Sequence, residues 1–510
     1  MEITFGGGLN EQDDTQVKPE ECTQGSNFEL SLGNTHFKPR LPFDLKGTAT
    51  NAASLNGLLQ LIKNDNTETT LVQSGDTVYL WDGTTTFTSK GTVTSTSKLR
   101  DVTWSLGGYI VITDLMKQTV IKKWDGTTFS TLTTGLGGTS LHAKYGLVHL
   151  GRVWLFNVKA GVDTPHLMVA AAFENPESYN TSLRAKDSSF TTGNEAFYMV
   201  SPDLLPINGA TVFMGILIIS TENGRIWKLD GTSSLNFAWV PFYSGSSAIG
   251  TETMANIGND VVYMRNGGVI EAMRSTQDYG DVKNDDLTRW ITTTAAGLTG
   301  AITVYDQERQ KVYFFAGANK LLVFFKHLAM TELSPWSVYK TDHTSSFDAT
   351  CAKYMRAPGT STWYVFWADS TGKIYRMDGE GTGDPSSTNI NTSRRTKYLY
   401  DEEIEELSFV SGRVEYKRIA NCSLLMDFEW ADDYSIARCT VPLEGPPIGD
   451  AATYYGGSAY YGGAFYYNTG FFYANRISTK GFSPVGRGPG VYLTTTVQAT
   501  QEFDIIKIRT

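Results

Sequence analysis

The chain has 510 residues, of which 41% are hydrophobic and 12% aromatic, with 50 glycines and a net charge of −10. This length exceeds the roughly 100–200 residues of an ordinary domain and predicts either several domains or one large repeat architecture. The acidic balance argues against a nucleic-acid-binding groove, which needs clustered Lys and Arg, and four cysteines without a CxxC pair exclude a disulfide framework and a zinc site.

The first 45 residues are rich in turn formers and contain two basic–proline steps, Lys38-Pro39 and Arg40-Leu41-Pro42. We expect residues 1–45 to form an extended arm that lies along another part of the assembly. The opening stretch, MEITFGGGLNEQDD, has neither the basic nor the apolar segment of a secretory signal peptide. No apolar run approaches the ~20 residues of a membrane span. We therefore expect synthesis in the cytoplasm and no stable membrane insertion.

A repeated phrase marks residues 46–390. Each copy has a β-branched residue four positions before an aspartate, a large apolar residue directly before it, and a glycine after it. The aspartates are Asp82, Asp125, Asp230 and Asp378. Large residues that alternate with period two predict a half-buried strand, and Asp-Gly suits the two positive-φ positions of a type I′ hairpin turn. Each copy is thus predicted to be a hairpin whose aspartate bends the backbone and does no chemistry.

Most of these hairpins follow a further strand and turn, which gives three-strand antiparallel meanders spaced by roughly 35–60 residues. Meanders at this period are typical of a β-propeller, in which each blade packs against its neighbours. The chain is therefore predicted to be all-β, with a propeller of six to eight antiparallel blades over residues 46–390. The Gly-His of WD40 repeats and the Asp box of sialidases are absent.

Residues 391–510 contain alternating strands without the Asp-Gly turn and predict a separate β-sandwich-like domain. Within it lies a Tyr/Gly-rich tract, residues 453–474, whose aromatic pairs recur every six residues at Tyr454, Tyr460, Tyr466 and Phe472. An even spacing puts them on one face of an extended chain, and so much aromatic surface rarely stays exposed. Three alternatives remain open: contact with a neighbouring subunit in a ring, packing within the chain as a kinked hairpin, and a platform for sugars.

No catalytic constellation stands out. The six histidines form neither HxH nor HExxH, and Gly-x-Ser-x-Gly and P-loop motifs are missing. Pairs such as Asp285-Asp286 and Asp432-Asp433 could serve a glycosidase, but the sequence does not place them. We therefore expect no enzyme activity, metal or cofactor. One acidic run is either a solvated loop or a source of negative potential for a pore wall or a divalent ion; its acidic members are Asp401, Glu402, Glu403, Glu405 and Glu406.

The start of the chain resembles the tail hub or nozzle proteins of short-tailed bacteriophages. The resemblance lies in Gly8-Leu9-Asn10, Pro19-Glu20-Glu21-Cys22, Asn27-Phe28-Glu29 and Lys38-Pro39, and extends loosely to Thr303–Tyr339 and the last residues. It implies a structural virion protein: a homohexameric ring at the distal end of the tail, adjoining adaptor, fibre or needle proteins. Genomic DNA would leave through its channel without specific binding, because an acidic wall repels phosphate.

On this interpretation the acidic run above supplies candidates for the channel charge. The candidates for contacts between subunits are Tyr454, Tyr460, Tyr466, Phe472, Phe28 and Phe37. The alternative is a propeller lectin or receptor-binding module that recognises host glycans. A propeller glycosidase ranks after it, because the chain has neither an Asp box nor a secretion signal.

Overall fold

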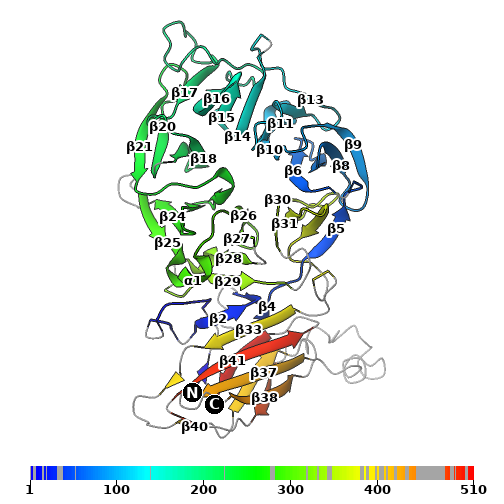
Figure 1. The fold of residues 1–510 in the computed structure, drawn as a ribbon, viewed down its shortest axis with the longest axis vertical. Helices are drawn as coiled ribbons and strands as arrows, with labels where there is room; N and C mark the ends of the chain where they lie inside the picture. The colour runs from blue at the N-terminus through cyan, green and yellow to red at the C-terminus, as the bar shows by residue number, and fades with distance from the viewer. Residues whose placement is uncertain are drawn as a thin grey trace, which may run out of the picture.

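Seven four-stranded antiparallel sheets follow one another along the chain and form a ring (Figure 1). The computed structural model describes every residue except 1, 4–6, 14–15, 19, 31–37, 52, 138, 223, 276–281, 318–319, 330–331, 342–346, 380–383, 386–389, 397–398, 401–406, 409–411, 418–421, 431–435, 444–476, 483–486, 489, 500–503 and 510. The protein is a β-propeller, as the sequence predicted, and the number of blades is seven.

The strands of the first four blades, in chain order, are β6 (Leu55–Ile62), β7 (Glu68–Ser74), β8 (Thr77–Trp81) and β9 (Phe87–Thr92); β10 (Leu99–Trp104), β11 (Tyr109–Asp114), β12 (Lys122–Trp124) and β13 (Phe129–Thr131); β14 (Leu141–His149), β15 (Arg152–Ala160), β16 (Val162–Ala170) and β17 (Phe197–Val200); β18 (Ile207–Phe213), β19 (Ile216–Thr221), β20 (Arg225–Asp230) and β21 (Ala238–Ser244). Blades 5 to 7 comprise β22 (Met254–Asn256), β23 (Asp260–Met264), β24 (Ile270–Ser275) and β25 (Val282–Asp286); β26 (Ile302–Asp306), β27 (Lys311–Phe315), β28 (Leu321–Phe325) and β29 (Trp336–Tyr339); β30 (Cys351–Arg356), β31 (Trp363–Ala368), β32 (Lys373–Arg376) and β5 (Asp44–Thr48). The short helices are η1 (Ser105–Gly107), η2 (Thr251–Thr253), η3 (Leu287–Trp290), α1 (Thr292–Ala295) and η4 (Lys326–Leu328).

The first strand of each blade lies innermost. Each of these strands contacts the first strand of the next blade, and β30 contacts β6, so the seven strands close a ring around a central channel. In this arrangement every blade packs between two neighbours. Within the described residues no helix is both long and apolar enough to cross a membrane.

The N-terminal segment closes the ring. Strand β5 is the outer strand of blade 7 and pairs antiparallel with β32, with Thr48 opposite Lys373 and Asp44 opposite Arg376. It therefore crosses the boundary that the sequence analysis placed between an arm ending at residue 45 and a propeller beginning at 46. The last blade is built from both ends of the propeller segment.

In the strand before each Asp-Gly, the β-branched residue and the large apolar residue are buried, although they point to opposite faces. Val78 and Trp81, which point to opposite faces of β8, are 0% and 2% exposed. The equivalent residues of the other three copies are also buried: Ile121, Trp124, Ile226, Leu229, Ile374 and Met377. The sequence predicted burial on one face, whereas both faces contribute buried residues, because each blade is covered by a neighbour on either side.

Three of the four Asp-Gly pairs lie in hairpins between the third and fourth strands of a blade, but the turn is longer than predicted. Trp124 pairs with Phe129, so Asp125 begins a four-residue loop. Only the glycine has positive φ, at 94° for Gly126. The carboxylate of Asp125 accepts hydrogen bonds from the backbone N–H groups of Thr127 and Thr128, both at 2.8 Å. The aspartate holds the loop through its side chain, and type I′ geometry is absent here.

We expect Asp125→Ala to lower the free energy of unfolding by about 1 kcal/mol at neutral pH, because two backbone donors lose their acceptor. The hydrogen bond from Thr128 is the main cause that lowers the pKa of Asp125 below its ordinary 3.8. The stabilisation is therefore present above pH ~4 and is lost as the pH falls through the folded-state pKa. Chemical unfolding at several pH values measures both effects. Asp230→Ala is the control, since among the described residues Asp230 accepts a single N–H, that of Gly231 at 3.0 Å. Equal losses at the two positions would contradict the explanation.

The remaining strands form the C-terminal β part, and N-terminal strands join it. Its main sheet has the order β2-β33-β41-β37-β38, with β34 beside β41, and a second sheet has the order β1-β42-β36-β39. Two small sheets pair β3 with β4 and β35 with β40. The bounds are β1 (Glu2–Ile3), β2 (Cys22–Ser26), β3 (Phe28–Glu29), β4 (Lys38–Pro39), β33 (Ile390–Thr396), β34 (Leu399–Tyr400), β35 (Leu407–Ser408), β36 (Gly412–Lys417), β37 (Cys422–Trp430), β38 (Ile436–Leu443), β39 (Ile477–Phe482), β40 (Arg487–Gly488), β41 (Gly490–Ala499) and β42 (Asp504–Arg509).

Candidate functional site

Most of the residues singled out from the sequence lie outside the described residues: Phe37, Tyr454, Tyr460, Tyr466, Phe472, Asp401, Glu402, Glu403, Glu405 and Glu406. Phe28 is described and is 0% exposed. The guanidinium of Arg394, on β33, lies 5.8 Å from the centre of its ring. Because the Phe28 side chain is fully covered within one copy of the chain, it offers no surface to another subunit.

The described residues of the N-terminal phrases that carry the resemblance form a seam between the propeller and the C-terminal sheet (Figure 1). Gly8 donates its N–H to the carbonyl of Ser334 at 2.7 Å, and Leu9 donates to Trp336 at 2.8 Å, so this phrase extends along the outer strand of blade 6. Asn10 donates to the buried carboxylate of Glu21 at 2.7 Å, and that carboxylate also accepts the N–H of Ser334. Strand β2, which follows, pairs with β33. The arm thus contacts both blade 6 of the propeller and the main C-terminal sheet.

A buried ion pair fastens the second half of the arm. The guanidinium of Arg40 binds both carboxylate oxygens of Asp384, one of them at 2.8 Å. The two side chains are 1% and 3% exposed. Arg40 also donates to the Asn27 side chain at 3.0 Å, and Asn27 in turn accepts the N–H of Lys340 at 2.7 Å. The two hydrogen bonds between Arg40 and Asp384, together with the bond from Arg40 to Asn27, offset the cost of removing both charges from water.

The fourth Asp-Gly belongs to a buried charge network and not to a hairpin, so this part of the sequence prediction is wrong. Asp378 itself has positive φ, at 53°, and its side chain is 2% exposed. Its carboxylate lies 3.0 Å from the guanidinium Nε of Arg309 and 3.7 Å from the ammonium group of Lys311. That ammonium group also binds the carboxylate of Glu29 in the arm, at 2.7 Å. Burial disfavours the charge on Lys311, but Asp378 and Glu29 outweigh it and raise the pKa of the ammonium group.

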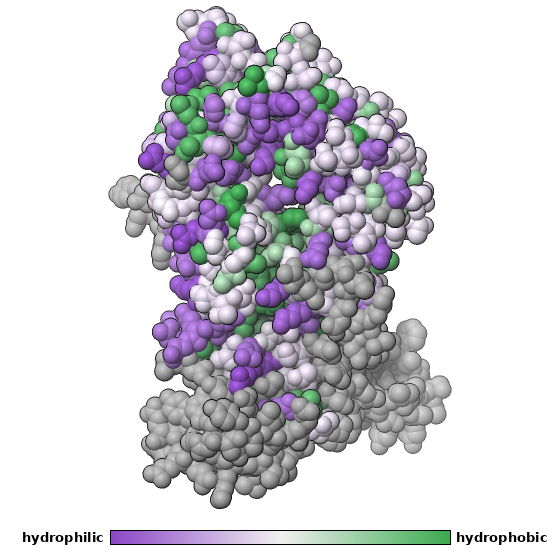
Figure 2. Space-filling view, in the orientation of Figure 1, coloured by the Kyte–Doolittle hydropathy of each residue, from purple (hydrophilic) through white to green (hydrophobic). Residues whose placement is uncertain are grey.

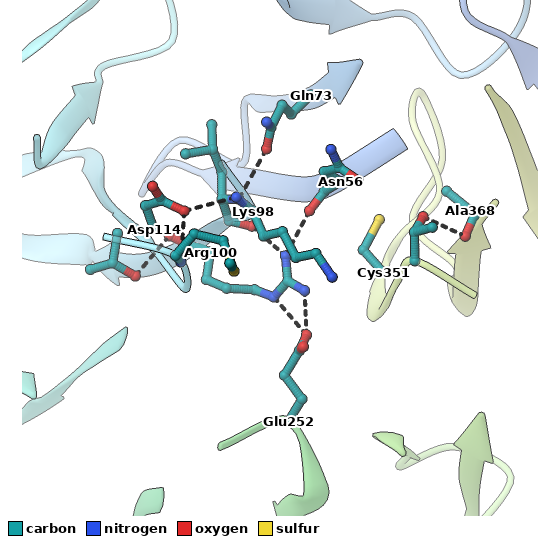
Figure 3. Close-up of polar contacts among 12 residues, drawn as sticks. Asn56, Gln73, Lys98, Arg100, Asp114, Glu252, Cys351 and Ala368 are labelled. Carbon is teal, nitrogen blue, oxygen red and sulfur yellow. Dashed lines mark hydrogen bonds and ion pairs between the residues drawn. The ribbon is translucent and has the colours of Figure 1, made fainter. Parts of the chain in front are cut away.

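A second ion pair spans the mouth of the central channel. Figure 3 shows Arg100 and Glu252 extending toward one another, Arg100 from the innermost strand of blade 2 and Glu252 from η2 before blade 5. The guanidinium Nε donates to the carboxylate at 2.9 Å, and a terminal nitrogen donates to the same oxygen. Arg100 also donates to the carbonyl of Asn56 at 2.9 Å. Blades 2 and 5 are as far apart as a seven-membered ring permits, so the pair bridges the opening.

A cavity of about 430 Å³ lies beside this pair. Its walls come from the connections that enter blades 2, 5, 6 and 7, with Lys98, Glu252 and Gly300, and from the innermost strand of blade 3, which contributes Lys144. Ile249, Ala301 and Phe315 give it an apolar part. The nearby thiol of Cys351 is buried, and burial raises its pKa to about 12, so it stays protonated. Figure 2 shows the visible face of the propeller with hydrophilic and hydrophobic atoms interspersed and a hollow near its middle.

Sequence reasoning missed both ion pairs. Arg100 and Glu252 are 152 positions apart, and Arg40 and Asp384 are 344 apart. No local spacing relates residues at such distances, and only closure of the ring brings them together. Among the described residues, no group of three or more His, Cys, Asp and Glu side chains is placed to hold a metal ion.

No protein-family model matches the chain, and no curated protein matches its sequence. Solved structures with similar folds include YCF48 bound to D1 peptide, with 11% identity, a TM-score of 0.40 and coverage of 66% of this chain and 97% of that one. BBS1N in complex with ARL6DN has 6% identity, a TM-score of 0.43 and coverage of 70% and 98%. The β-propeller domain of Cps50 (Swd1) from Myceliophteria thermophila has 12% identity, a TM-score of 0.39 and coverage of 66% and 100%. Likenesses at these identities concern the fold alone, and the sheet order places this chain among the β-propellers.

Proposed function

We propose that the protein is a structural component of a short-tailed bacteriophage virion, the hub or nozzle ring at the distal end of the tail through which genomic DNA is ejected. Its partners are copies of itself, six in a ring, and the adjoining adaptor, fibre or needle proteins of the tail. The proposal begins from the N-terminal phrases that resemble this class of protein.

One observation carries the proposal furthest: the described residues of these phrases lie at the seam between the propeller and the C-terminal sheet. The N–H groups of Gly8 and Leu9 donate to backbone carbonyls at the edge of blade 6. The carboxylate of Glu21 accepts a hydrogen bond from the backbone N–H of Ser334, at the same edge. The N–H of Asn27 donates to the carbonyl of Val338 at 2.9 Å, and its carbonyl accepts a hydrogen bond from the hydroxyl of Thr392 at 3.2 Å. Proteins in which the same two parts are joined in the same way would share the residues at the junction. The resemblance therefore concerns the way in which the propeller and the C-terminal sheet are joined. Function follows here by analogy of architecture.

In this proposal the DNA passes through the bore of the assembled ring and not through the propeller. The channel of each propeller is bridged by Arg100 and Glu252. It leaves no passage for a duplex without breaking that pair. The six propellers would therefore act as rigid walls around the bore. Closed cyclic symmetry requires each subunit to join its neighbour through two different surfaces.

Negative-stain microscopy and light scattering on the purified full-length chain test the proposal. The expected result is a six-fold ring with a central hole and a mass six times 56.2 kDa. The double variant Tyr460→Ser, Tyr466→Ser is expected to give dispersed monomers with an unchanged circular dichroism spectrum. The control is Met214→Ser, which removes a side chain that is 62% exposed on the turn between β18 and β19. Monomers at all concentrations of the wild type, or glycan binding by those monomers, would contradict the ring.

A further inference from the structure

The cavity at the channel mouth is lined by a net positive charge, although the chain as a whole is acidic. The whole chain has a net charge of −10. Yet Lys98, Lys144 and Arg100 converge here, and Glu252 is the only acidic residue among those that line the cavity. These four charges sum to +2, because the Arg100–Glu252 pair is neutral and two lysines remain.

The ammonium groups of the two lysines lack a partner among the described residues. Within the described part of the chain, the Nζ atoms of Lys98 and Lys144 form no hydrogen bond and no ion pair. Lys353, on the innermost strand of blade 7, does form an ion pair, with Asp101. Burial and the positive charge of Lys117 lower the pKa of Lys144, while Glu252 raises it. Figure 3 shows the side chain of Lys98 reaching toward the guanidinium of Arg100. Like charges gathered in a hollow repel each other unless an anion joins them.

The cavity also has room for a ligand. Its volume of about 430 Å³ lies in the range of small-molecule sites. Two of its wall residues are glycines, Gly250 and Gly300, and a Cβ added at either would meet no atom within 4 Å. The space in front of both backbones is therefore open. Ile249, Ala301 and Phe315 give part of the wall an apolar surface, beside which a charge–charge contact is screened less than in bulk water.

We propose that this cavity binds a small dianion, a phosphate monoester or a dicarboxylate, between the ammonium groups of Lys98 and Lys144. The Arg100–Glu252 pair forms the inner wall of the site, and Glu252 limits the affinity by repelling the ligand. Lysines suit such a ligand because they act as mobile point charges on flexible stems and need no fixed planar geometry. The inference concerns the propeller alone and is independent of the proposed assembly.

Calorimetric titration of the full-length protein with inorganic phosphate and, separately, with succinate tests the site. Saturable binding to the wild type is expected, and the tighter of the two probes identifies the chemistry. Lys98→Met and Lys144→Met should each weaken binding about tenfold or more, since each removes a charge-assisted hydrogen bond. Glu252→Gln should strengthen it several-fold, the opposite sign, because it removes the only acid and keeps an oxygen for Arg100 to bind.

Two further variants separate charge from shape. Gly300→Leu should abolish binding without any change of charge, since its side chain enters the cavity. Lys228→Met, on the third strand of blade 4 and outside the cavity, should leave affinity unchanged. Circular dichroism confirms that each variant is folded. No binding of either probe to the wild type, wild-type affinity in either lysine variant, or weaker binding by Glu252→Gln would overturn the proposal.

Discussion

Arg40→Met is expected to lower the free energy of unfolding by about 3–5 kcal/mol, the cost of leaving one partner of a buried ion pair without the other. The carboxylate of Asp384 would keep the backbone N–H of Phe43, at 3.3 Å, as its one remaining partner among those described. The side chain of Asn27 would also lose a donor. Chemical unfolding of the full-length chain, followed by tryptophan fluorescence, measures the loss.

A matched surface pair provides the control. Lys18 and Glu332 lie 2.6 Å apart, but their side chains are 37% and 91% exposed. Solvent screens this pair, so Lys18→Met should cost less than about 1 kcal/mol. The double variant Arg40→Met, Asp384→Leu should recover much of the stability, because no buried charge then remains unpaired. An Arg40→Met variant no less stable than Lys18→Met would refute the explanation.

Gly8→Ala is expected to release the start of the arm from blade 6. A Cβ at this position would lie 2.2 Å from the carbonyl oxygen of Trp336 and 2.8 Å from that of Ser334, and both atoms belong to backbone that cannot rotate away. The clash should cost about 3 kcal/mol, as severe overpacking does. A glutamate-specific protease measures the release, because Glu21 is 1% exposed in the folded chain and becomes accessible once the arm detaches.

Gly300→Ala is the matched control, since its Cβ would meet no atom within 4 Å. It should be cleaved at Glu21 as slowly as the wild type. Equal cleavage rates for Gly8→Ala and the wild type would show that the seam tolerates a side chain at this position. The resemblance would then lose its structural basis, because Gly8 would no longer be required by the seam.

The propeller could be predicted from the sequence because its blades are local. The residues of a hairpin such as Val78, Trp81 and Asp82 are close in sequence, and their pattern reflects packing that recurs in every blade. The depth of burial could not be predicted, since the second face of each strand is covered by the next blade. The turn type was also wrong, because the side chain of Asp125 offers hydrogen bonds that a two-residue turn does not use.

The candidate sites depend on contacts between distant parts of the chain. Asp378 follows the same local pattern as Asp125, yet it lies among Arg309, Lys311 and Glu29. Its sequence neighbours carry no sign of this, because two of these partners come from blade 6 and the third from the arm. The same holds for the lysines of the channel mouth. The Tyr/Gly tract and the acidic run remain predictions.

Strand β5 has a consequence for the order in which the molecule can be made. A ribosome synthesises residues 44–48 first and their partners, residues 373–376, only after six other blades have left it. At about 5–20 residues per second the first-made strand waits on the order of half a minute for its neighbour. During that interval the first and the last finished blades each have an uncovered face, and strand β5 has no partner and could pair with the wrong strand. The cell must therefore keep nascent chains apart until translation has passed residue 376, and slower elongation lengthens the exposure.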